Sequence, residues 1–198
     1  RLLRRKNVAE ALLLARWLRS EAWVVTTGGV SSAEETNYAR RLQEAAGPAG
    51  WNLRLGLLAG NEGRKPTVPE LLAASEVVLL TSLFEGFGLP YLEAAAAHRP
   101  LLARRLPGIA PDLARFGFRF PQAYDEILID PALFDWTAET ARQRALWKSW
   151  MQQLPRTCRA LAGRPAVLAA GDVPRPVPFS RLTLTAQLEV LRQPTAAS

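Results

Sequence analysis

One stretch, residues 76–93 (EVVLLTSLFEGFGLPYLE), constrains the fold more than any other part of the chain. Residues 76–81 form a continuous β-rich apolar run, which is typical of a strand covered on both faces of a parallel sheet. Gly86 and Gly88 let backbone N–H groups approach a ligand closely, because no Cβ intervenes. Pro90 suits the first turn of a helix. The stretch therefore predicts a strand, a glycine turn and a helix N-terminus that favours anions.

Two glutamates bracket these glycines. Glu85 lies before the helix predicted from Leu89, and Glu93 lies about one turn inside it. The two carboxylates therefore do not face each other, but both can contact one ligand at the helix N-terminus. Two solvated glutamates on a surface helix with a glycine cap are the purely structural alternative.

The segment EGFGLPYLE, residues 85–93, resembles the E-x7-E motif of the group 1 (family four) retaining glycosyltransferases. Ser82, three residues before the first glutamate, fits the Ser that usually stands there in this family. The resemblance implies an α/β fold, with a Rossmann-like parallel sheet and helices on both faces. It also implies that this domain is the C-terminal, donor-binding half of a two-domain GT-B enzyme.

The resemblance also implies roles for the motif residues. Glu85 is the expected catalytic residue and would accept hydrogen bonds from hydroxyls of the donor sugar. Glu93 would accept them from the ribose hydroxyls. The residues between them that are expected to bind the donor are Gly86, Phe87, Gly88 and Leu89.

Basic residues at the start of the chain resemble a second feature of the family. There, an Arg and, about five residues later, a Lys bind the donor diphosphate, and Arg1 and Lys6 have this spacing. Each cation would supply charge-assisted hydrogen bonds to phosphate oxygens. Arg4 and Arg5 offer alternative registers, and a solvated basic cluster before a helix is the structural alternative.

Strand and helix signals alternate through the first half of the chain. Strands are expected at residues 22–27, 52–58, 76–81 and 100–103, and helices are expected to begin at Asn7 (with Glu10), Ser32 (with Glu35), Thr67 (with Glu70) and Gly108. The pair Gly47-Pro48 is expected to end the second helix. This alternation predicts a parallel sheet whose ligand lies beyond the C-terminal ends of the strands.

Three loops are expected at that edge besides the motif. Gly28-Gly29 resembles the family's short glycine loop near the donor phosphates, although two glycines are as often only a turn. Residues 57–60 are expected to border the base. Residues 106–112 (LPGIAPD) depart from the glycine pair and Glu that family members often carry, which leaves the wall beside the donor sugar undefined.

The signals change after residue 117. Short strands are expected at 118–120 and 127–129, and a long helix at 136–154. The segment 182–191 alternates Leu and Thr like a strand, but the resemblance favours a terminal helix. The predicted organisation is a nucleotide-sugar-binding domain over residues 1–163 with a truncated first strand, a proline-rich linker over 164–179, and a terminal helix and tail over 180–198.

The formal net charge is +7, from 25 basic and 18 acidic residues. Such a balance invites a nucleic-acid interpretation. The basic residues are scattered, however, and no recognised nucleic-acid motif accompanies them, so we expect no nucleic-acid partner. A basic surface attracts anionic membrane faces as well as nucleotide diphosphates. Peripheral membrane association of the full-length protein therefore stays open.

Single residues argue against several further chemistries. Cys158 is the only cysteine, which excludes an internal disulfide and agrees with a cytoplasmic location. His98 is the only histidine, and no G-x-S-x-G elbow accompanies it, so a Ser-His-Asp hydrolase is not supported. No Asp-x-Asp pair occurs, and we expect neither a catalytic metal nor another cofactor. The chain has no initiating Met, no signal-peptide pattern and no apolar run that could cross a bilayer, and we expect it to begin mid-protein.

The resemblance implies hexosyl transfer from a nucleotide diphosphate sugar, with an acceptor bound by an N-terminal domain of the same protein. A glycoside hydrolase also uses two carboxylates, but places them about 5 to 9.5 Å apart across one bond, which a pair eight residues apart need not satisfy. A non-catalytic nucleotide- or nucleic-acid-binding module and a GT-B sugar-nucleotide epimerase are two more candidate classes.

Overall fold

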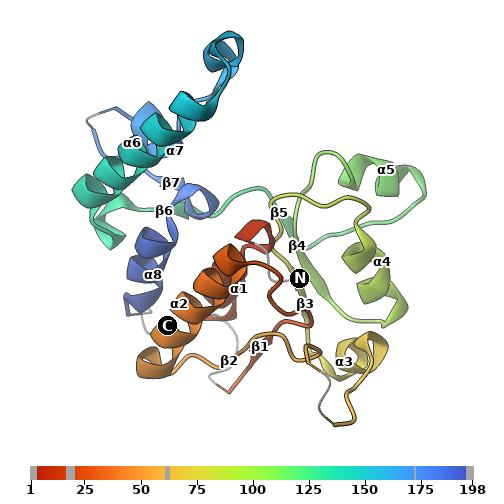
Figure 1. Cartoon of the computed structure of the whole chain (residues 1–198). Coiled ribbons are helices and arrows are strands. Elements are labelled where there is room, and N and C mark those ends of the chain that lie inside the picture. Colours follow the sequence, from red (N-terminus) through yellow and green to blue (C-terminus); the bar gives the residue numbers. More distant parts are fainter. Residues whose placement is uncertain (1–3, 17–20, 61–62, 172, 195–198) are drawn as a thin grey trace. The chain divides into compact units, whose positions relative to one another are not determined.

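The computed structural model describes residues 4–16, 21–60, 63–171 and 173–194. The chain forms two compact units, Arg1–Asp125 and Glu126–Ser198 (Figure 1). The division therefore falls at residue 125 and not at residue 163, where the sequence was expected to divide.

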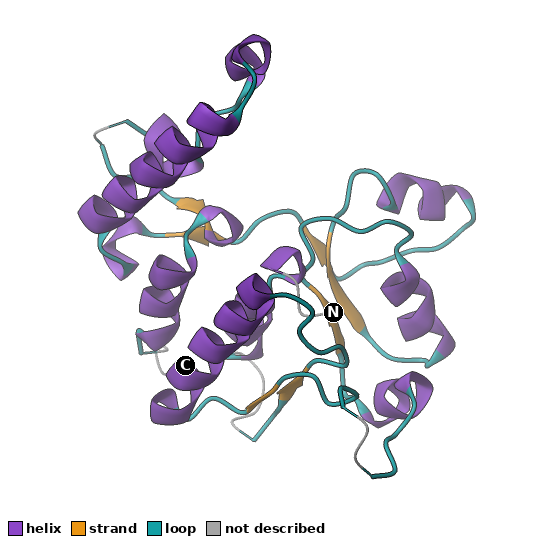
Figure 2. Ribbon diagram, viewed as in Figure 1, coloured by secondary structure: helices purple, strands orange, loops and turns teal. Residues whose placement is uncertain are grey.

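The first unit alternates helices and short strands. In chain order its elements are the 3-10 helix η1 (Arg4–Lys6), α1 (Val8–Ala15), β1 (Val24–Val25), α2 (Ala33–Ala49), β2 (Leu53–Arg54), α3 (Val68–Ala74), β3 (Val78–Leu80), α4 (Leu89–Ala96), β4 (Leu101–Arg104), α5 (Ala110–Arg115) and β5 (Ala123–Tyr124). Strands β1, β2 and β3 lie within their expected ranges but are shorter, whereas β4 has the expected four residues shifted by one position (Figure 2).

All strand pairs of this unit are parallel. Strand β1 pairs with β2, and β3, β4 and β5 form a second sheet in that order. Helices α1 and α2 lie on one side of the strands, and α3, α4 and α5 lie on the other (Figure 1). The predicted Rossmann-like α/β class, with parallel strands between two helix layers, is confirmed.

Two helix starts follow the predicted capping chemistry. The Ser32 hydroxyl accepts a hydrogen bond from the Glu35 N–H at 3.2 Å before α2. Thr67 and Glu70 form a complete capping box before α3, in which each side chain accepts from the other residue's N–H. These side chains satisfy N–H groups that have no partner within the helix.

Two further predictions of helix ends are wrong in detail. Asn7 does precede α1, but its side chain makes no capping bond, because the residue has a left-handed φ of 52° and its amide instead donates to Glu10. Pro48 does not stop α2. The helix continues to Ala49, because it ends at the left-handed φ of 67° that Gly50 adopts.

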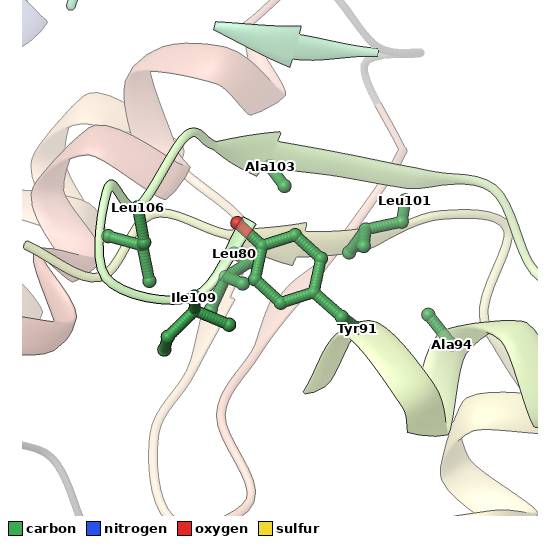
Figure 3. Packing of buried hydrophobic residues seen from close by; sticks show 7 residues of the cluster. All are labelled: Leu80, Tyr91, Ala94, Leu101, Ala103, Leu106 and Ile109. Atoms are coloured by element: carbon green, nitrogen blue, oxygen red, sulfur yellow. The ribbon is translucent and has the colours of Figure 1, made fainter. Parts of the chain in front are cut away.

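A hydrophobic cluster holds α4 against β3 and β4 (Figure 3). Its buried residues are Leu80, Tyr91, Ala94, Leu101, Ala103, Leu106 and Ile109. The ring of Tyr91 extends from α4 toward the strands, and its hydroxyl donates to the Arg104 carbonyl at 2.8 Å. Burial raises the pKa of Tyr91, so the phenol stays protonated and keeps this donor. The start of α4 is thereby tied to the end of β4.

The strand expected at residues 118–120 is not formed. The Phe118 N–H donates to the Leu113 carbonyl at 3.2 Å, in the turn that ends α5. The ring of Phe120 lies 4.5 Å from that of Tyr91, so this apolar run packs on the α4 cluster through its rings. The strand follows at Ala123–Tyr124 as β5.

The second unit contains β6 (Leu128–Ile129), η2 (Pro131–Leu133), α6 (Trp136–Gln153), η3 (Arg156–Leu161), α7 (Ala166–Ala169), β7 (Val177–Pro178), η4 (Phe179–Arg181) and α8 (Leu184–Arg192). The strand near 127–129, the long helix and the terminal helix are as predicted. The expected linker over 164–179 instead contains α7 and β7, and β7 pairs antiparallel with β6. Val167 and Val177 are buried, which gives this segment a share in the unit's core.

No helix within the described ranges is both long and apolar enough to cross a membrane.

Candidate functional site

Two predicted site residues, Lys6 and Glu85, meet Ser82 just beyond the carboxyl end of β3. The Lys6 ammonium donates to Glu85 Oε1 and forms an ion pair with it. The Ser82 hydroxyl donates to the same oxygen at 2.6 Å. Ser82 is buried, and the Glu85 side chain is 9% exposed. We call Lys6, Ser82 and Glu85 the site cluster.

The site cluster keeps Glu85 ionised. Partial burial alone would raise the pKa of this carboxyl, but the hydrogen bonds from Lys6 and Ser82 and the charges of Lys6 and Arg5 outweigh it. The pKa of Glu85 is therefore lowered from its ordinary value. At neutral pH the cluster presents one carboxylate and one ammonium side by side.

The backbone of η1 is fixed to the segment that follows β3. The Leu83 N–H donates to the Arg5 carbonyl at 2.8 Å, and the Thr81 hydroxyl donates to the Lys6 carbonyl, also at 2.8 Å. Thr81 is itself buried. Residues 75 to 79 positions apart are thus brought together, which spacing along the sequence does not show.

The two motif glycines differ in what the fold requires of them. Gly88 caps α4 with a left-handed φ of 71°, and a Cβ there would lie 2.5 Å from Ile109 Cγ2 and 3.3 Å from Tyr91 Cδ2. Gly86 has no left-handed φ, and a Cβ there would meet nothing within 4 Å. Close packing therefore explains Gly88, while Gly86 borders open space.

The remaining residues predicted to bind the donor lie outside the site cluster. Glu93 is exposed on α4. Phe87 is 87% exposed in the turn, and Leu89, the first residue of α4, is 57% exposed. Arg1 lies outside the described residues. Among the predicted site residues that are described, the structure brings together the Lys6 and Glu85 side chains.

The loops after β1 and β2 touch each other. The Leu57 and Leu58 N–H groups donate to the carbonyls of Thr26 and Thr27 at 2.9 and 3.1 Å. A Cβ on Gly29 would lie 2.6 Å from Ala59 Cβ, so the glycine is needed for this contact. The glycine loop and the expected base-side loop are therefore adjacent, as the parallel pairing of their strands predicts.

A lysine holds the base-side loop from its far end. The Lys65 ammonium donates to the carbonyls of Leu58, Ala59 and Gly60, with distances of 3.4 Å to Leu58 and 2.5 Å to Gly60. Three carbonyls around one ammonium fix the curvature of the loop. Lys65 was not among the predicted site residues.

The loop over residues 106–112 supports the motif turn. Leu106 and Ile109 are buried in the α4 cluster, and Ile109 packs on Gly88. The expected helix, α5, begins at Ala110, two residues after Gly108. This loop departs from the family pattern in sequence, but its apolar residues give it a structural role beside the motif.

A buried polar network next to Lys6 was not predicted from the sequence. The spacing from Asn7 indicates only a capping role for Glu10, yet this residue is fully buried and binds Arg104, Tyr124 and Asn7. The signal that could have found it is a lone carboxylate in the otherwise apolar helix VAEALLLA. A buried carboxylate needs such partners.

The described residues contain no group of three or more His, Cys, Asp or Glu side chains arranged to hold a metal ion.

The first unit and its site cluster define a Rossmann-like α/β domain with a charged site beyond the end of a parallel strand. A model of the family described as glycosyl transferases group 1 matches residues 1–131, which is more than half of the chain. The chain therefore belongs to the group 1 glycosyl transferases. The match ends close to residue 125, where the first unit ends. Comparisons with curated proteins and with solved structures gave no match.

Proposed function

We propose that this chain contains the donor-binding domain of a retaining glycosyltransferase of the hexosyl-transferring kind, and that the first unit binds a nucleotide diphosphate sugar. The observation that carries the proposal is the site cluster, in which an ammonium and an ionised carboxylate lie together beyond β3. The family indicates glycosyl transfer. The site cluster would provide a positive charge for the diphosphate and a carboxylate for the sugar hydroxyls.

The two charges fit the two ends of the reacting bond. When the bond between the sugar and the diphosphate breaks, negative charge develops on the leaving oxygen, and the Lys6 ammonium would stabilise it. The Glu85 carboxylate would accept hydrogen bonds from sugar hydroxyls and hold the ring in place. Glu93, on the exposed face of α4, would accept bonds from the ribose.

The proposed partner for catalysis is an N-terminal acceptor-binding domain of the same full-length protein, in the cytoplasm or at the inner face of the membrane. No metal or other cofactor enters the proposal, because Lys6 would supply the positive charge at the diphosphate. The 198-residue chain should then bind a nucleoside diphosphate and transfer no sugar by itself. Sugar transfer by this chain alone would contradict the division of roles.

Calorimetry on Lys6→Ala tests the phosphate role. The probes are the diphosphates of uridine, guanosine and adenosine, each compared with its nucleoside. Loss of a charge-assisted hydrogen bond costs about 1.5 to 3 kcal/mol, so the diphosphate that wild type binds should weaken about tenfold or more. The nucleoside should be affected much less.

Lys148→Ala is the matched control, because Lys148 is exposed on α6 and the same charge is removed. It should leave both affinities unchanged. Equal losses for diphosphate and nucleoside in Lys6→Ala would remove Lys6 from the phosphate site. Preferential binding of a DNA duplex, falling steeply with salt, would instead support the nucleic-acid interpretation.

A further inference from the structure

Lys6 is followed by a residue in an unusual backbone conformation. Asn7 has a φ of 52°, which is left-handed, and it is 3% exposed. Asparagine tolerates this region better than most residues, but the conformation persists only where neighbours hold it. The Asn7 amide donates to Glu10 Oε2 at 2.8 Å, so the turn after Lys6 is held by one buried carboxylate.

That carboxylate is held in turn by two strands. Arg104, on β4, donates to Glu10 Oε1 and Oε2 at 2.5 and 2.6 Å. Tyr124, on β5, donates its hydroxyl to Glu10 Oε1 at 2.6 Å. Each oxygen of Glu10 therefore accepts from two donors, and the Glu10 side chain is 0% exposed.

The arginine is anchored independently of Glu10. Its guanidinium donates to the Asp125 carbonyl at 2.8 Å and lies 5.4 Å from the centre of the Tyr124 ring. Its own carbonyl accepts the Tyr91 hydroxyl from α4. The Asn7 turn and helix α4 are therefore both positioned by the carboxyl end of β4.

We propose that Glu10 is a positioning residue: through Asn7 it sets the direction in which Lys6 projects, and so holds the ammonium against Glu85. The backbone on either side of Lys6 is then fixed, by the Leu83 N–H on the Arg5 carbonyl before it and by the Asn7 turn after it. Buried ion pairs often add little stability compared with apolar residues of the same size, so a geometric role is a better account of this one.

The test uses Asn7→Gly in the 198-residue chain. Glycine adopts the left-handed turn easily, so the backbone path is permitted while the amide that locks it is removed. The readout is the rate at which an amine-reactive reagent modifies Lys6, measured by mass spectrometry and divided by the rate for Lys148 in the same molecule. This ratio needs no ligand.

We expect the ratio to rise about fivefold in Asn7→Gly, the change that follows from losing one net hydrogen bond. Tyr124→Phe should raise it by a smaller factor, since it removes one donor to Glu10. The matched control is Tyr38→Phe, which deletes a buried hydroxyl that accepts a hydrogen bond from the Ala9 N–H of α1. It should leave the ratio unchanged.

An unchanged ratio in both Asn7→Gly and Tyr124→Phe, with circular dichroism like wild type, would overturn the inference. An equal rise of the labelling ratio in Tyr38→Phe would also overturn it, because the higher reactivity of Lys6 would then reflect a general loss of packing. If Asn7→Gly does not fold, Tyr124→Phe decides by the same ratio.

A second measurement concerns the ligand and rests on the proposed function. Affinity for the nucleoside diphosphate that wild type binds should fall about fivefold in Asn7→Gly, in parallel with the labelling ratio. Unchanged affinity would refute a role for the turn in binding. If wild type binds none of the three diphosphates, the proposed function fails, while the labelling ratio still decides whether Glu10 positions Lys6.

Discussion

Replacing Gly88 by Ala should destabilise the first unit without touching a charged group of the site. The left-handed φ of 71° costs a residue with a Cβ about 1 to 2 kcal/mol. The new Cβ would also lie 2.5 Å from Ile109 Cγ2, a branch close to the backbone that cannot simply swing away, which adds about 1 to 3 kcal/mol of overpacking. Alanine also lowers the conformational entropy of the unfolded chain, which offsets about 0.4 to 1 kcal/mol of this destabilisation. The expected net loss is about 1 to 4.5 kcal/mol.

Urea denaturation followed by circular dichroism measures this loss, and Gly86→Ala is the control. That glycine has no left-handed φ and free space at its Cβ, so its unfolding free energy should change by less than about 1 kcal/mol. It should instead weaken diphosphate binding if the backbone there approaches the donor. Combining Ile109→Ala with Gly88→Ala tests the contact directly, because the double variant should lose less unfolding free energy than the sum of the two single losses. A Gly88→Ala protein as stable as wild type would refute the packing argument.

Three further predictions concern single side chains. Glu93→Gln should weaken both nucleoside diphosphate and nucleotide sugar in calorimetry, whereas Glu85→Gln should spare the diphosphate; melting curves would confirm that both variants fold. Burial raises the pKa of Tyr38 from 10.0 to about 12, so the folded state holds its proton more tightly. The contribution of this pKa difference to the free energy of unfolding is complete below pH 10, and up to about 3 kcal/mol of it is lost as the pH rises toward 12. The urea midpoint of Tyr38→Phe should therefore fall less over this pH range than that of wild type. Thr67→Ala should cost about 1 kcal/mol, because it removes the oxygen that accepts the Glu70 N–H, and the same urea titration would detect it.

The sequence was most informative where local chemistry decides the structure. The strand, turn and helix of residues 76–93 follow from apolar run, glycine and proline, and the capping box at Thr67 follows from residue type and spacing. The parallel pairing follows from the alternation of strands and helices. Each of these is set by residues a few positions apart.

Features that depend on distant contacts were not predictable. The pairing of Lys6 with Glu85 joins residues 79 positions apart, and it was not anticipated even though both residues were expected in the site. Nothing local distinguishes Glu10 as a carboxylate held by β4 and β5, because those partners lie far along the chain. The apolar run at 118–120 has the composition of a strand, but ring packing on Tyr91 determines its structure.

The contact between Gly29 and Ala59 should make substitutions in two separate loops depend on each other. Because a Cβ at position 29 would lie 2.6 Å from the Ala59 methyl group, a larger residue at position 29 has no room while Ala59 keeps its place. A substitution at position 29 would be accepted only after a compensating change at position 59. In an alignment of relatives, these two positions should therefore vary together, although each loop follows a different strand.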